Sequence, residues 1–284
     1  MNTWANPNHN ILRIRLTEKK YADAFMKRGC IKFNTPESWE KYEKANGAGR
    51  GDAYEGTLGF CHYLDIKKAS ELDKKYSLST NSKTHSREVI KKKYNQRILF
   101  KDKRSMNLPC FCLYMIKVDS FFPPKKAGVQ YLKMSIPGSY FKDFVDNKTE
   151  DEIKKLPKES QPALIVINDF EKFITRLKKK LYNLGVQENE ILIDYIKYLN
   201  FEKYGSNGWI DFGTEFPKEL FIKNLRFENQ REGRIIVNTN KKNILDTLSK
   251  PIDLGAMSDI ATMVSGYYPE GLEAQVKALI NYKE

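Results

Sequence analysis

The stretch PALIVINDFEKFITRLKKKLYNLG, residues 162–185, places a continuous apolar strand directly before the clearest helix of the chain. Apolar residues recur 3, 4, 7 and 11 positions after Phe170, which is the spacing of one apolar helix face. Asn168 is expected to cap this helix, because asparagine side chains accept backbone N–H groups at helix starts. The segment ILIDYIKYLNF, residues 191–201, then returns as a strand.

The alternation of strands and helices extends in both directions from this stretch. Residues 11–16, ILRIRL, alternate apolar and basic side chains, which predicts a strand with Arg13 and Arg15 on one face. The segments PCFCLYMIKV (109–118) and VQYLKMSI (129–136) are typical of buried strands. Residues 252–264 and 270–283 are expected to form one short strand followed by two helices.

The order of these elements predicts the fold class. Strands mix with helices without a strict βαβ rhythm, which favours the α+β class over a doubly wound fold. We therefore expect one domain over residues 1–284, with a single mixed, mostly antiparallel sheet and flanking helices. Residues 66–107, which are polar and basic, are expected to be an insertion within that domain.

The charge of the chain indicates what kinds of partner it could attract. The 284 residues carry a formal net charge of +13. A basic excess of this size attracts polyanions, so nucleotides, nucleic acid and anionic membranes are candidate partners. The alternative is a lysine-rich surface with no such partner, since charge alone does not choose one.

Targeting signals and cysteine chemistry favour a cytoplasmic protein. No run of 18 apolar residues exists, so no transmembrane helix and no membrane partner are expected. The start, MNTWANPNHN, lacks the basic-then-apolar order of a secretory signal. The four cysteines are expected to be reduced thiols, and with only three histidines a zinc site is improbable.

A polar cluster at the mouth of an apolar strand is the first candidate site. It lies in FENQREGRIIVNT, residues 227–239. If a strand begins here, Gln230, Glu232 and Arg234 share one face. A carboxylate between a carboxamide and a guanidinium can bind a ribose diol or orient a nucleophile, and Arg234 would hold Glu232 ionised. The alternative is a solvated edge strand whose ion pair contributes little.

A glycine-rich loop and a hydroxyl-rich loop are further candidates. GRGDAYEG, residues 49–56, sets Asp52 and Glu55 among glycines that allow close approach to a ligand, although it is not a P-loop. The alternative is an ordinary turn with solvated acids. KKYSLSTNSKT, residues 74–84, offers the hydroxyl groups of Ser79 and Thr80, but such runs are most often flexible loops.

The basic segment is a candidate nucleic-acid surface. Residues 87–104 hold eight lysines and arginines, with Tyr94 and Phe100 interleaved. Lysines on phosphates with an aromatic ring on a base would suit a single strand. The residues expected to make these contacts are Lys91, Lys92, Lys93 and Arg97. A solvated charge run is the alternative.

Several short motifs, in order, resemble bacterial DUF2971-type proteins, a group found with phage-defence and abortive-infection genes. They are FMKRGCIKF, GRGDAYEG, FIKNLRFENQREGRI and LGAMSDIA, which together span about residues 11–262. The resemblance implies an antiviral-defence protein, with a phage component as a candidate trigger. The middle of the chain, including the basic segment, has no counterpart in the group.

A weaker resemblance is to ADP-ribosyltransferases, which use an early arginine strand, a Ser-Thr-Ser-like strand and a Gln/Glu-x-Glu motif. Arg13 or Arg15, Ser79-Thr80, and Gln230 with Glu232 occur here in that order, although the distance from Ser79 to Glu232 is longer than usual. The resemblance implies NAD as the substrate.

Three functions follow from these observations. The first is an enzyme acting on a nucleotide or nucleic acid, concretely NAD-dependent ADP-ribosyl transfer. Glu232 would stabilise an oxocarbenium-like transition state, Gln230 would orient the acceptor, and Arg15 would hold a pyrophosphate. The second is a nuclease in which Asp52, Glu55 and Glu232 hold Mg²⁺. The third is a non-enzymatic sensor or binding module for a phage component or nucleic acid.

Overall fold

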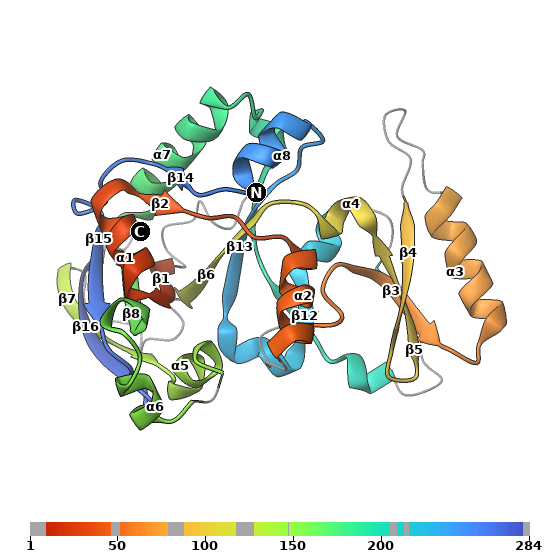
Figure 1. The fold of residues 1–284 in the computed structure, drawn as a ribbon, viewed down its shortest axis with the longest axis horizontal. Coiled ribbons are helices and arrows are strands. Elements are labelled where there is room, and N and C mark those ends of the chain that lie inside the picture. Colours follow the sequence, from red (N-terminus) through yellow and green to blue (C-terminus); the bar gives the residue numbers. More distant parts are fainter. Residues whose placement is uncertain are drawn as a thin grey trace.

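The computed structural model describes residues 10–46, 52–78, 88–117, 128–146, 148–204, 209–212 and 216–280. Figure 1 shows an elongated molecule with one large sheet and its helices at one end and a smaller sheet at the other. Two elements from distant parts of the sequence, α2 (Pro36–Asn46) and β12 (Ile222–Asn224), lie between these two parts.

The larger sheet has six antiparallel strands in the order β15-β8-β1-β6-β13-β9. The strands, in sequence order, are β1 (Asn10–Glu18), β6 (Cys110–Lys117), β8 (Pro162–Ile167), β9 (Ile191–Tyr195), β13 (Glu232–Val237) and β15 (Ala261–Ser265). One face packs on the main apolar core, which α1 (Lys19–Arg28), α7 (Phe170–Asn183) and α8 (Lys242–Leu248) cover.

Helix α7 follows its sequence pattern closely. Phe170, Phe173, Leu177 and Leu181 are its buried residues, and each belongs to the main core. The predicted cap is off by one residue. The Asp169 side chain accepts from the backbone N–H of Lys172, whereas Asn168 donates to the Thr262 hydroxyl.

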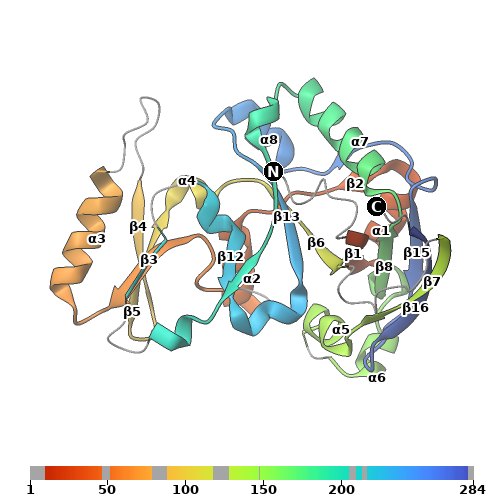
Figure 2. The ribbon, with the colours of Figure 1, turned by 180° about the vertical axis from the view of Figure 1, so that it is seen from behind.

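The opposite face of the six-stranded sheet carries a second, smaller apolar cluster. Ile14 and Leu16 of β1 pack there with Phe141 of α5 (Gly138–Phe144) and Ile136 of β7 (Gly128–Ile136). Helix α6 (Glu150–Lys154) lies near α5, as Figure 2 shows from behind. Leu16 and Tyr114 of this cluster also line the cavity described below.

The smaller sheet has four antiparallel strands in the order β11-β3-β5-β4. They are β3 (Thr57–His62), β4 (Val89–Tyr94), β5 (Arg97–Asp102) and β11 (Ile210–Asp211), and α3 (Ile66–Leu78) packs on one face. Two of the strands and α3 come from residues 66–107. The segment predicted as a polar insertion therefore supplies much of a sheet, followed by α4 (Lys103–Met106).

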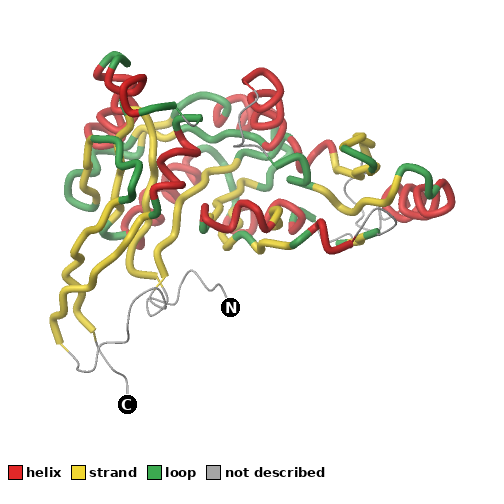
Figure 3. The backbone as a smooth tube through the Cα atoms, turned by 90° about the horizontal axis from the view of Figure 1, so that it is seen from below, coloured by secondary structure: helices red, strands yellow, loops and turns green. Residues whose placement is uncertain are grey.

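Three two-stranded sheets complete the described strands. They pair β2 (Cys30–Ile31) with β14 (Ile252–Asp253), β7 with β16 (Leu272–Ile280), and β10 (Lys197–Leu199) with β12. The last pair alone among the described pairings is parallel. The β7–β16 ribbon extends away from the body of the molecule (Figure 3). Short 3-10 helices occur at Lys158–Ser160, Glu188–Glu190, Phe201–Tyr204, Lys218–Phe221 and Leu225–Gln230.

The C-terminal prediction of two helices is wrong. Residues 252–280 instead form β14, β15 and β16, and the helix that precedes them is α8. Residues 272–280 carry apolar side chains at every second position, which is the period of a strand. These residues form a strand because they pair with β7, which is far away in the sequence.

The α+β class is confirmed, with mostly antiparallel strands and helices outside the sheets. The strands are distributed over five described sheets rather than one. Among the helices of the described ranges, none is long and apolar enough to cross a membrane.

Candidate functional site

A cavity lies where two central strands of the six-stranded sheet separate. β1 and β6 pair only as far as Ile14 and Tyr114, whereas β1 continues along β8 and β6 continues along β13. The cavity has a volume of about 430 Å³, a floor from β6 and β13, and walls from α2, α5 and the segment around β12. Small-molecule sites have volumes of roughly 300–1,000 Å³, so this cavity can hold a ligand of nucleotide size.

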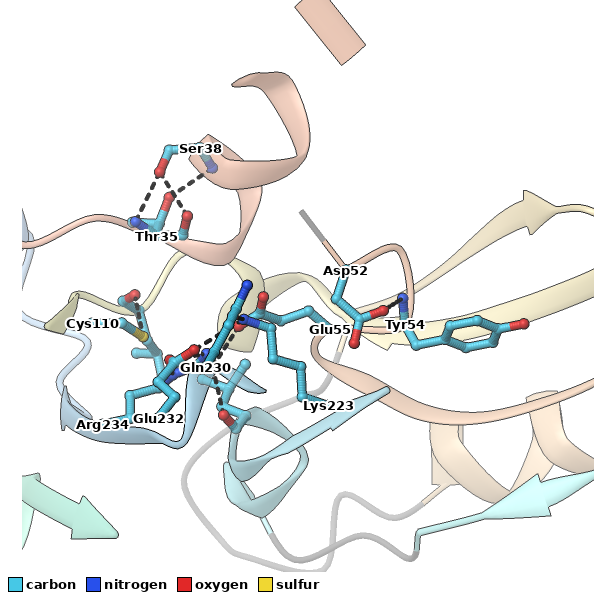
Figure 4. Close-up of polar contacts among 12 residues, drawn as sticks. Thr35, Ser38, Asp52, Tyr54, Glu55, Cys110, Lys223, Gln230, Glu232 and Arg234 are labelled. Atoms are coloured by element: carbon cyan, nitrogen blue, oxygen red, sulfur yellow. Dashed lines mark hydrogen bonds and ion pairs between the residues drawn. The ribbon is translucent and has the colours of Figure 1, made fainter. Parts of the chain in front are cut away.

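Glu232 and Arg234 form the centre of the cavity floor. They are two positions apart on β13, so their side chains leave the sheet on the same face. Arg234 donates to Glu232 Oε1 from Nε at 2.9 Å and from Nη2 at 2.6 Å. Lys223, from β12, donates to Glu232 Oε2 at 2.9 Å (Figure 4). Glu232 is therefore held between two cations on elements far apart in the fold.

A second carboxylate reaches the same guanidinium. Glu55, in the turn before β3, pairs with Arg234 Nη1, which also donates to the Leu220 carbonyl oxygen at 2.6 Å. Glu55 Oε1 makes this ion pair without a directed hydrogen bond in the described part of the chain. One buried arginine thus bridges Glu55 and Glu232, and all three side chains line the cavity.

The environment moves the pKa values of the two carboxylates in opposite directions. Burial raises the pKa of Glu55 above its ordinary value, in spite of the charges of Arg234 and Lys223. Burial alone would also raise the pKa of Glu232, but Arg234 and Lys223 outweigh it and hold this pKa well below the ordinary range. The difference arises because Glu232 accepts directed hydrogen bonds from both cations. Glu55 is consequently the protonatable member of the pair.

Gln230 reaches the site by a route that the strand prediction did not foresee. It ends a 3-10 helix, and β13 begins only at Glu232, so the two residues do not share a strand face. Arg231 between them has a φ of 39°, in the left-handed region. This turn directs Gln230 back to Lys223, whose Nζ donates to Gln230 Oε1 at 2.7 Å. The predicted proximity is present, through a tight turn and a shared lysine.

Asp52 has a structural role rather than a place in the cavity wall. Its Oδ1 accepts from the Tyr54 backbone N–H at 3.0 Å (Figure 4). Its Oδ2 accepts from the Asn224 backbone N–H at 2.6 Å. The carboxylate therefore fixes the turn that carries Glu55 against β12, which carries Lys223. Asp52, predicted to contact a ligand, is buried and is not among the residues that line the cavity.

Only one of the two predicted arginines of β1 lies at the site. Arg15 lines the cavity and donates from Nη1 to the Cys112 carbonyl oxygen at 2.8 Å, across the gap between β1 and β6. Arg13 is 7 % exposed, and its guanidinium lies 4.2 Å from the centre of the Phe170 ring at the main core. The assignment of Arg13 to substrate binding is therefore wrong.

The residues predicted to bind nucleic acid are largely engaged within the protein. Lys91 pairs with Asp73, and Lys92 pairs with Glu40. Arg97 is buried and donates to the Tyr54 hydroxyl at 2.6 Å, so its assignment to a phosphate is corrected. Lys93 is exposed. Ser79 and Thr80, predicted to contact substrate, lie outside the described residues.

The predicted convergence of three carboxylates on Mg²⁺ is not found. The described ranges contain no group of three or more His, Cys, Asp or Glu side chains arranged to hold a metal ion. Asp52 turns its two oxygens to backbone N–H groups, which leaves Glu55 and Glu232 with Arg234 between them. The cations that face these carboxylates are the Arg234 guanidinium and the Lys223 ammonium group.

Sequence reasoning gave no role to several residues of the site. Lys223 lies within the motif FIKNLRFENQREGRI, but its contact with Glu232 depends on the turn at Arg231. Cys112, a free thiol on β6, also lines the cavity. Its position opposite Arg234 in the β6–β13 register could be known only from the pairing of the strands. Trp39 and Tyr140 come from helices that no sequence motif connects to β13.

No protein-family model, curated protein or solved structure matches this chain. The resemblances to the DUF2971 group and to ADP-ribosyltransferases therefore stay predictions. What can be concluded about the site depends on its own geometry and electrostatics.

The lowered pKa of Glu232 predicts how stability depends on pH. The folded state keeps Glu232 ionised below the pH at which an unfolded glutamate, with a pKa of about 4.3, takes up a proton. The stabilisation by ionised Glu232 is thus complete above that pH and is lost as pH falls. The difference in unfolding free energy between wild type and Glu232→Gln should shrink by up to about 1.4 kcal/mol per pH unit.

Urea unfolding from neutral pH down to about pH 3 measures this difference. Glu55 titrates in the opposite sense, because its pKa is raised. The same comparison in a Glu55→Gln background removes that contribution. A difference that stays constant with pH in this background would contradict the assignment of a lowered pKa to Glu232.

Proposed function

We propose that the cavity is the active site of an enzyme that acts on the glycosidic bond of a nucleotide, with NAD as substrate and transfer of its ADP-ribosyl group as the reaction. The observation that carries the proposal is the pair formed by Glu55 and Glu232. Two carboxylates share one guanidinium, line one cavity of nucleotide size and have pKa values shifted in opposite directions. Such divergence between neighbouring groups is how active sites divide acid–base and electrostatic roles.

Glu232 would serve as the fixed anion of the reaction. Cleavage of the bond between the ribose C1′ and the nicotinamide nitrogen leaves positive charge on the ribose ring, and the bonding electrons leave with neutral nicotinamide. A carboxylate with a lowered pKa stays ionised beside that charge and is a poor base. A ribose hydroxyl would donate to Glu232 from within the cavity, since a carboxylate can accept more than one hydrogen bond on each oxygen.

Glu55 would move the proton. As the acceptor atom forms its bond to C1′, it releases a proton, and Glu55 can take it because burial raises the pKa of this carboxyl. Gln230 accepts from Lys223 through Oε1, which leaves its amide N–H groups to orient the acceptor. Arg15 lines the cavity and is the residue that we assign to the pyrophosphate.

The test is incubation of the folded protein with NAD, alone and with a cell lysate, while NAD loss and transfer of labelled ADP-ribose are followed. We expect NAD loss that requires the folded protein. Neither NAD loss nor label transfer, from protein shown to be folded by circular dichroism, would overturn the proposed reaction.

A binding module without turnover is the second candidate function. It is favoured by the full engagement of Glu232, whose two oxygens already accept from Arg234 and Lys223. Saturable NAD binding with no NAD loss would favour this candidate over the enzyme.

The cellular role is part of the same proposal and depends on the DUF2971 resemblance alone. It is that of a cytoplasmic effector of phage defence, triggered by a phage component or a nucleic acid. The charge of +13 supports an anionic partner, although Lys92 pairs with Glu40 and Arg97 is buried against Tyr54. Protection of bacterial cells against phage, lost in Glu232→Gln, would support the role.

A further inference from the structure

The cavity has an aromatic part as well as a charged floor. Trp39 and Tyr42, one turn apart on α2, line one wall, and Tyr140 and Phe144 of α5 line another. The Tyr42 hydroxyl donates to Asp146 Oδ2 at 3.1 Å, which joins α2 to the end of α5. The two helices therefore bound a slot whose sides are aromatic rings.

Tyr140 and Trp39 each pack against a neighbour that also lines the cavity. The Tyr114 and Tyr140 rings lie 4.5 Å apart between centroids, and the Arg234 guanidinium lies 5.0 Å from the centre of the Trp39 ring. Trp39 also packs on the apolar cluster that includes Cys110 and Ile236. Rings fixed in this way lose little conformational freedom when they bind a ligand, which suits stacking on a flat partner.

We infer that the ligand of this cavity carries a nucleobase-like planar heterocycle, which stacks in the slot between α2 and α5 with Trp39 as the residue that selects it. The inference rests on the proposed function, which places the ribose of the ligand on the charged floor beside Glu232. A ligand of two parts fits the two parts of the cavity. Burying a polar sugar phosphate against aromatic rings costs free energy, because its hydrogen bonds to water are not replaced. A planar heterocycle in the same place is stabilised by stacking on the rings and by removal of its apolar surface from water.

Calorimetric titration of the full chain with AMP, UMP, nicotinamide mononucleotide and ribose 5-phosphate tests this inference. At least one of the three nucleotides should bind ten times or more tightly than ribose 5-phosphate, since stacking on an aromatic side chain favours a base strongly. Equal affinity for ribose 5-phosphate, or no binding by any nucleotide at millimolar concentration, would overturn the inference.

The variant Trp39→Leu tests whether the preference for a nucleotide over ribose 5-phosphate arises in the slot. It should weaken the preferred nucleotide about tenfold and leave ribose 5-phosphate unchanged, while Trp39→Phe should restore much of the affinity. Trp209→Leu is the matched control, because Trp209 is 47 % exposed and packs on Lys68 of α3. Equal weakening of nucleotide and ribose 5-phosphate in Trp39→Leu would exclude Trp39 as the selecting residue. Binding is measured without turnover, so a failure of the proposed reaction would be seen separately.

Discussion

Replacement of Arg234 by methionine should lower the free energy of unfolding by about 3–5 kcal/mol. The Arg234 side chain is 1 % exposed and pairs with Glu232 and Glu55, whose side chains are 8 % and 4 % exposed. Without the guanidinium, two buried carboxylates would face each other with Lys223 as the nearest cation. Urea unfolding at neutral pH measures the loss.

The matched control is Arg176→Met, which removes a bidentate arginine–carboxylate pair at the surface. Arg176 and Asp259 are 30 % and 54 % exposed, so the loss should stay within about 1 kcal/mol. Neutralising both acids in the Arg234→Met background, as Glu55→Gln with Glu232→Gln, should recover part of the stability. An Arg234→Met loss no larger than that of Arg176→Met would show that the buried cluster is not held together as described.

Turnover of NAD should fall by about 10²–10³-fold in kcat when Glu232 is replaced by glutamine, with little change in KM. The substitution keeps the shape of the side chain but removes the fixed negative charge that, in the proposed reaction, would lie next to the ribose. The loss should appear in kcat because that charge matters most when positive charge develops in the transition state. Steady-state kinetics on protein with an unchanged circular dichroism spectrum measures the effect.

Glu55→Gln should change the reaction in a different way. Because Glu55 would carry the proton, its removal should abolish the limb of the pH–rate profile that reports this carboxyl. Glu188→Gln is the control, since Glu188 is an exposed partner of Lys178 outside the cavity and should leave the profile intact. A purely structural role for Glu55 would lower the rate at every pH and leave the shape of the profile unchanged.

Local sequence patterns predicted those parts of the site that depend on a single element. Glu232 and Arg234 are correctly placed on one face, because strand periodicity alone determines that relation. Arg13 and Arg15 also follow strand periodicity, but the pattern could not show that Arg13 packs on Phe170. The pairing partners of β1 decide that outcome, and they lie roughly a hundred residues or more away.

The contacts between elements could not be predicted. Glu55 meets Arg234 because Asp52 ties its turn to Asn224, a contact between residues 172 positions apart. Trp39 and Tyr140 both line the cavity, which lies where β1 and β6 separate. No short sequence motif indicates that separation. Sequence reasoning found the two glutamates and the two arginines of the site and missed Lys223 and the aromatic rings. Aromatic residues in helices are ordinarily explained by core packing.

Glu40 makes the cavity depend on a part of the chain that does not line it. This residue of α2 pairs with Lys92 of β4 and with Lys101 of β5, whose side chain is fully buried. Trp39 next to it is thereby anchored to the small sheet. Deleting residues 66–107 would remove both partners of Glu40, Lys92 and Lys101. The wall of the cavity that α2 provides would then lose its connection to the small sheet. Lys92 and Lys101 of the basic segment therefore support the wall of the cavity that α2 provides.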